Sequence, residues 1–114
     1  MKKTIDDSIN HFNWLIYVTG HTKIPYLVDP AVEIDRAYKT FTDLIFTDIL
    51  NDPEKAKKDC EALRKELITL MDAATEIIGT LKNSDNLRCG TAVLIYNKLC
   101  VILDFLDDFQ QQPA

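Results

Sequence analysis

Three aspartates close to the C-terminal end are the residues of this sequence whose types and spacing best fit a catalytic or metal-binding site. Asp104, Asp107 and Asp108 stand in the stretch LDFLDDF, and residues three or four apart share one side of a helix. Pairs of carboxylates on facing helices hold magnesium in helical hydrolases, because this cation prefers oxygen ligands. Asp104-x-x-Asp107 has no counterpart, since no E-x-x-E or E-x-x-D occurs elsewhere. A metal-dependent hydrolase that uses these aspartates is therefore an alternative, and we expect neither a metal nor a cofactor.

The two histidines do not strengthen the case for catalysis. Neither His11 nor His21 follows an acidic residue by three positions, so the E-x-x-H pattern of di-iron helical bundles is absent. Asp7 precedes His11 by four residues, and the two side chains could form a polar pair on a helix surface. His21 follows Gly20 and fits the exit of a helix. We expect no catalytic residues and predict that the chain is not an enzyme.

The three cysteines favour a reducing compartment. Cys60, Cys89 and Cys100 are an odd number without C-x-x-C spacing, which suits free thiols better than a disulfide framework or a zinc site. The sequence begins MKKTIDDSIN, where two aspartates interrupt what would be the apolar part of a signal peptide. We therefore expect a cytoplasmic protein that does not enter a membrane.

The charge balance argues against nucleic acid as a partner. The chain has 18 acidic and 13 basic residues and a formal net charge of −5, so no general attraction to phosphate is expected. A basic stretch from Lys55 to Lys65 leaves RNA binding through this face as a second alternative. Acidic residues interleave with its cations, however, and a solvated helix face explains the pattern without a ligand. The charged residues of the region are Glu54, Lys55, Lys57, Lys58, Asp59, Glu61, Arg64, Lys65 and Glu66.

Helices must position whatever site the chain has. Three glycines and four prolines leave little material for turns, whereas 114 residues with 46% hydrophobic content suffice for one core. Apolar residues recur in alternating steps of four and three through residues 54–82, which indicates one long amphipathic helix. We predict an all-α single domain, a four-helix antiparallel bundle with its third helix the longest. The stripe of that helix is Ala56, Cys60, Leu63, Leu67, Leu70, Ala74, Ile77 and Leu81.

Capping signals indicate where the helices begin. Asp29 and Asp52 each precede a proline, so their carboxylates can accept the free amides of a first helical turn. Thr4, which is followed by two aspartates, provides a similar start for the first helix. The predicted helices cover about residues 4–19, 30–50, 53–82 and 85–110. The link at 20–30 is expected to form an extended strap, and the tail at 111–114 to be disordered.

The first and fourth helices carry apolar residues on two sides, although a bundle helix needs only one. This second face is either buried against the rest of the domain or exposed for association. Burial of a large apolar side chain contributes about 1.5–3 kcal/mol, so an exposed face would promote binding to another protein. The residues of the second face are Trp14, Tyr17 and Val18 on the first helix and Leu94, Val101 and Phe105 on the fourth.

We adopt the exposed alternative as the functional prediction. The chain would bind another protein as a small adaptor, chaperone or inhibitor, or bind itself as a homodimer. The three aspartates of the fourth helix would form the polar surroundings of this surface. Antiparallel pairing also brings them near the basic start of the third helix, which predicts that Asp104 lies beside Arg64 or Lys65.

Overall fold

Four helices make up the described part of the chain. The computed structural model describes residues 4–21 and 29–111. Helix α1 spans Ile5–Gly20, α2 Pro30–Asn51, α3 Pro53–Leu81 and α4 Asn86–Gln111. Each bound lies within one residue of the range expected from the sequence, and α3, with 29 residues, is the longest. Most of the expected strap, at 22–28, and the tail from residue 112 lie outside the described residues.

The helices begin at side chains that accept the free amides of the first turn. Thr4 and Asp7 form a capping box, in which each side chain accepts a hydrogen bond from the backbone N–H of the other. The carboxylate of Asp29 accepts from the start of α2, and that of Asp52 from the start of α3. The carboxylate of Asp85 does the same for α4, where it accepts a hydrogen bond from the backbone N–H of Arg88, the third residue of the helix. Local sequence therefore determines where each helix starts.

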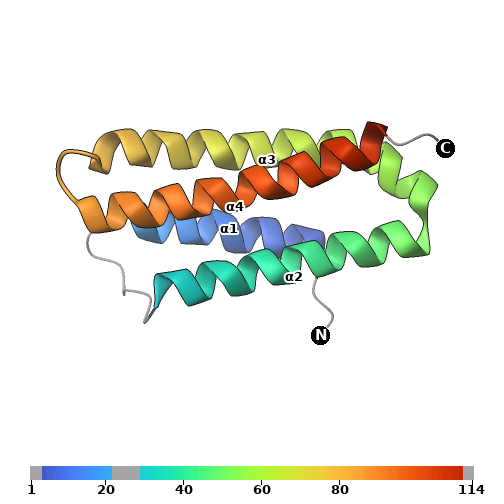
Figure 1. Cartoon of the computed structure of the whole chain (residues 1–114), viewed down its shortest axis with the longest axis horizontal. Helices are drawn as coiled ribbons and strands as arrows, with labels where there is room; N and C mark the ends of the chain where they lie inside the picture. Colours follow the sequence, from blue (N-terminus) through green and yellow to red (C-terminus); the bar gives the residue numbers. More distant parts are fainter. Residues whose placement is uncertain (1–3, 22–28, 112–114) are drawn as a thin grey trace.

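The bundle is antiparallel and closely connected. Along the chain, successive helices run in opposite directions, so that α2 and α4 point one way and α1 and α3 the other (Figure 1). In this view α3 lies at the top and α2 at the bottom, while α4 lies in front of α1. Every helix contacts each of the other three. The predicted all-α antiparallel bundle is thus confirmed.

The core contains the main stripes of all four helices. The rings of Phe12 in α1 and Phe41 in α2 are both fully buried, and their centroids lie 5.8 Å apart. Leu67 of α3 and Leu99 of α4 are buried beside them in the same cluster. By length and composition α4 could also cross a membrane, but the same composition is expected of a helix that contributes Leu99 and its neighbours to a bundle core.

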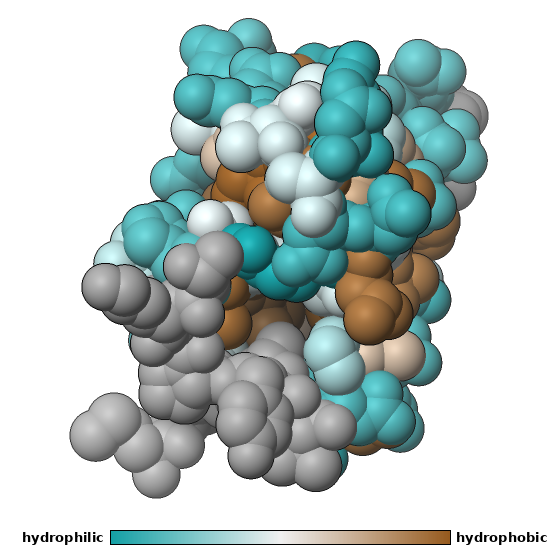
Figure 2. All heavy atoms as spheres, turned by 90° about the vertical axis from the view of Figure 1, so that its left-hand side faces the viewer, coloured by the Kyte–Doolittle hydropathy of each residue, from teal (hydrophilic) through white to brown (hydrophobic). Residues whose placement is uncertain are grey.

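The C-terminal end of α1 is fixed by contacts with two other helices. The Nε of Arg88 in α4 donates a hydrogen bond of 2.9 Å to the carbonyl of Thr19. A Cβ at Gly20 would lie 2.9 Å from the side chain of Ile77, so glycine permits α3 to approach closely. Figure 2 looks onto this end of the bundle and shows a mixed surface, with hydrophobic residues reaching the surface on the right-hand side.

Candidate protein-binding surface

Two neighbouring helices expose apolar side chains side by side. The rings of Phe46 in α2 and Phe105 in α4 have centroids 5.2 Å apart. Phe46 is 53% exposed, and Leu50, one turn later, is 78% exposed. Val101 precedes Phe105 by one turn and is 49% exposed, while Phe105 is half-buried against the core. We call these four residues, Phe46, Leu50, Val101 and Phe105, the α2–α4 surface.

The spacing of these residues follows from the helical repeat. Phe46 and Leu50 are four residues apart in α2, as are Val101 and Phe105 in α4, so each pair stacks along one side of its helix. Because α2 and α4 run in the same direction (Figure 1), the two pairs meet where the phenylalanine rings touch. The interior of the bundle is already filled by the main stripes, so these side chains are left at the surface.

The structure divides the residues predicted from the second apolar face. On α4, Val101 and Phe105 belong to the α2–α4 surface, and Leu94 packs partly buried against the core two turns earlier than Val101. On α1, Trp14 and Tyr17 are each about half exposed. In Figure 1, α4 lies on the side of the bundle that faces the viewer, and α1 lies on the far side. The two helices therefore do not form one continuous surface.

Val18 does not belong to a surface at all. Its side chain is 7% exposed, because it follows the fully buried Leu15 by three residues and shares that side of α1.

Sequence reasoning also missed Phe46 and Leu50. The available signal was a pair of large apolar residues, four positions apart, beside the main stripe of α2 rather than on it.

The three aspartates of α4 have different surroundings. Asp107 accepts a hydrogen bond and ion pair from Nε of Arg64 in α3. Asp104 and Asp108 are exposed and have no ion pair within the described residues. The expected pairing between the start of α3 and the end of α4 is therefore present, but Asp107 rather than Asp104 makes it.

Basic residues lie beside the α2–α4 surface, nearer the start of the two helices. The Nζ of Lys98 in α4 is 3.3 Å from the carboxylate of Asp35 in α2 and 4.8 Å from the ring centroid of Tyr38. Lys39 is exposed on the next turn of α2. Lys39 and the Lys98–Asp35 pair thus lie beside one end of the surface, and Asp104 and Asp108 lie toward the other end.

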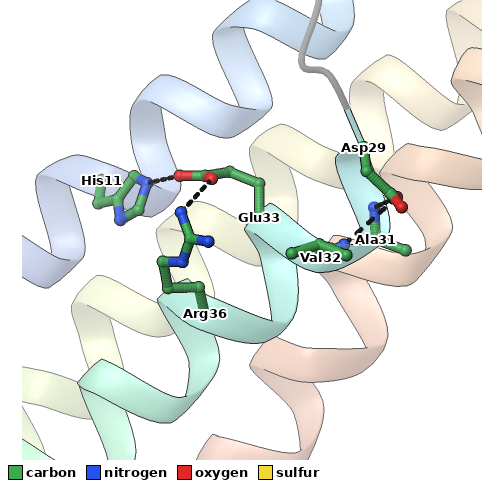
Figure 3. A network of polar contacts seen from close by, with 6 residues as sticks. All are labelled: His11, Asp29, Ala31, Val32, Glu33 and Arg36. Atoms are coloured by element: carbon green, nitrogen blue, oxygen red, sulfur yellow. Dashed lines mark hydrogen bonds and ion pairs between the residues drawn. The ribbon is translucent and has the colours of Figure 1, made fainter.

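His11 has a different partner from the one expected. Its Nε2 lies 3.2 Å from Oε1 of Glu33 in α2, and the other oxygen of Glu33 accepts from Arg36 at 3.3 Å. Figure 3 shows this chain of contacts between α1 and α2. Asp7, the predicted partner of His11, instead takes part in the capping box. The contacts connect two helices and include no nucleophile.

Cys60 is a core residue, whereas Cys89 and Cys100 are partly exposed. Cys60 is buried, and burial raises the pKa of its thiol, with the Asp107 carboxylate raising it further and Arg64 lowering it. The guanidinium of Arg88, the residue before Cys89, contacts the carbonyl of Thr19 and the carboxylate of Asp85. The described residues contain no group of three or more histidine, cysteine or acidic side chains suited to a metal ion.

The basic stretch of α3 is partly engaged within the molecule. Arg64 pairs with Asp107, and the ammonium of Lys57 lies 5.8 Å from the ring centroid of Phe109. Lys55, Lys58 and Lys65 are exposed. The Lys55–Lys65 stretch is therefore divided between contacts with α4 and solvated side chains.

No protein-family model, curated protein or solved structure matches this chain. Its own residues and their arrangement are the basis for the function proposed for it.

Proposed function

We propose that this chain is a protein-binding module that uses the α2–α4 surface, and that the first partner of this surface is a second copy of the chain. The observation that carries the proposal is the exposed apolar cluster of Phe46, Leu50, Val101 and Phe105 on two adjacent helices. Large apolar residues that cluster at a surface, rather than lying singly, favour association.

The size of the cluster predicts a weak dimer. Each large apolar side chain contributes about 1.5–3 kcal/mol when it is fully buried. Phe46, Val101 and Phe105 are already about half-buried in the monomer, so each of these three contributes less. Association must also offset the loss of translational and rotational freedom, about 4–15 kcal/mol. A few anchoring side chains dominate such interfaces. We therefore expect a dimer that dissociates on dilution, with Phe46 and Val101 near its centre.

The charges beside the surface favour a two-fold symmetric pairing. Lys39 and Lys98 lie toward the start of α2 and α4, whereas Asp104 and Asp108 lie toward the end of α4. A second copy rotated by a half-turn about an axis near Val101 places the lysines of each copy near the aspartates of the other. Such complementarity fixes the orientation of a weak complex.

Sedimentation equilibrium of wild type and two valine variants tests the proposal. Val101→Asp introduces a charge into the surface, beside the proposed two-fold axis. Val32→Asp is its matched control, because Val32 is a helical valine of equal exposure, 50% against 49%, at the far end of α2 from Leu50. We expect Val101→Asp to raise the dissociation constant of the dimer by at least about tenfold and Val32→Asp to leave it unchanged.

Circular dichroism and thermal melts of both variants are the folding control, since surface substitutions usually change stability by about 0.5 kcal/mol or less. A wild-type protein that stays monomeric at millimolar concentration contradicts self-association. Equal weakening by the two valine variants contradicts the assignment to the α2–α4 surface.

A further inference from the structure

We infer that a second surface, at the end of the bundle where α2 joins α3, is a groove for a cationic amphipathic helix of another protein. Helix α1 has 16 residues, against 22 in α2 and 29 in α3. It begins well short of the α2–α3 turn (Figure 1). Among the described residues, the apolar sides of α2 and α3 are therefore partly uncovered near the first turns of α1.

The groove has an apolar floor. A depression of about 210 Å³ is lined by Ile5 and Ile9 of α1 and by Ala62 and Leu63 of α3. A second crevice shares Ile5 and Leu63 and continues between the helices toward Phe109 of α4. Sites for drug-sized molecules usually measure about 300–1,000 Å³. The main depression is smaller than that, and its size suits one or two side chains of a docked peptide better than a cofactor.

The rim of the groove is acidic. Its charged lining residues are Asp6 of α1, Asp48 of α2, and Asp59 and Glu66 of α3, and none of its lining residues is basic. Within the described residues, none of these four carboxylates is in an ion pair, so no described cation neutralises the rim.

The combination of floor and rim specifies the occupant. An amphipathic helix inserts apolar side chains into a groove at intervals of three and four residues. Lysine or arginine residues flanking those anchors would meet the four carboxylates, and the net charge of −5 would attract such a helix from a distance. Asp59 and Glu66 are seven residues apart, so the rim extends about 10 Å along α3 at 1.5 Å per residue. This length matches two turns of a bound helix.

Titration with the leucine–lysine peptide LKKLLKLLKKLLKL, followed by amide chemical shifts, tests this inference. The Val101→Asp background is used so that self-association does not compete. We expect saturable shifts at Ile5, Ile9 and Leu63, and affinity that falls as salt concentration rises. The double variant Asp48→Lys with Asp59→Lys should bind the peptide at least about tenfold more weakly.

A charge-matched control distinguishes a site from general attraction. Asp43→Lys with Asp72→Lys makes the same change of net charge at exposed positions of the same two helices, and neither residue lines the groove. It should leave affinity within about twofold. Equal weakening by the two double variants overturns the inference, because net charge alone would then explain binding. Shifts of the parent Val101→Asp protein that avoid Ile5, Ile9 and Leu63 overturn it as well, whatever the double variants do, and they leave the proposed α2–α4 function untouched.

Discussion

The rings of Phe46 and Phe105 lie 5.2 Å apart with an interplanar angle of 40° and join the outer edges of α2 and α4. Tilted aromatic pairs at this separation attract each other beyond the area that they bury. Because Phe105 is anchored against the core, the contact fixes how far α2 and α4 rotate about their axes. It thereby holds the exposed Leu50 and Val101 on the same side of the molecule.

The aromatic pair should contribute measurably to stability. We expect a double-mutant cycle of Phe46→Ala and Phe105→Ala to give a coupling energy of about 0.5–1.5 kcal/mol in urea unfolding. Phe105→Ala alone should cost more than Phe46→Ala, because Phe105 is more deeply buried. A coupling energy near zero would show that the rings do not hold the two helices in register.

The cap that α4 provides for the end of α1 should matter more than an ordinary surface ion pair. Arg88 donates to the carbonyl of Thr19 with its side chain mostly buried, and hydrogen bonds to charged groups contribute about 1.5–3 kcal/mol. Arg88→Met should therefore lower the free energy of unfolding by about this amount. Lys98→Met removes a comparably buried cation of α4 from its pair with Asp35 and should cost no more than about 1 kcal/mol. Equal losses in the two variants would rule out a special role for the cap.

Cys60 should react with a thiol reagent far more slowly than Cys89 and Cys100. It is buried, whereas the other two are partly exposed, and burial raises the pKa of its thiol. The folded state therefore holds the Cys60 proton more tightly than the unfolded state does. This stabilising contribution is complete below the unfolded pKa and is lost as pH rises through the raised folded value. Mass spectrometry after brief labelling at pH 8 measures the order of reaction, and equal labelling of all three in the folded protein would contradict it.

Magnesium should leave the aspartates of α4 unaffected. Asp107 is already paired with Arg64, and the described residues contain no metal-binding cluster. Titration with magnesium chloride should therefore give no saturable amide shifts at Asp104 and Asp107, with potassium chloride at equal ionic strength as the control. Saturable shifts at both residues would revive the hydrolase alternative.

The helices and their starts could be predicted because their causes are local. The caps at Asp29 and Asp52, and the three-four rhythm of α3, depend on residues within a few positions of one another. The approximate pairing of helix ends also followed, since short connections force α3 and α4 to be antiparallel. For that reason Arg64 pairs with an aspartate near the end of α4. That aspartate is Asp107, which lies about one turn after the predicted partner, Asp104.

The surfaces were harder to predict because they depend on contacts between distant segments. The sequence indicates two apolar sides on α1 and α4, but it does not reveal that these helices lie on opposite sides of the bundle. The rotation of α2, which exposes Phe46 beside Phe105, is decided by packing across the core. For the same reason His11 meets Glu33 of another helix rather than Asp7 of its own, and Val18 is buried.

Isotope-filtered nuclear Overhauser spectroscopy on a mixture of labelled and unlabelled chains tests the α2–α4 surface most directly, since it detects contacts between copies alone. We predict intermolecular cross-peaks from the Val101 methyl groups to the ring protons of Phe46 and Phe105, and their disappearance on dilution. Intermolecular cross-peaks confined to Trp14 and Tyr17 of α1, or none at concentrations where sedimentation shows dimers, would contradict the account.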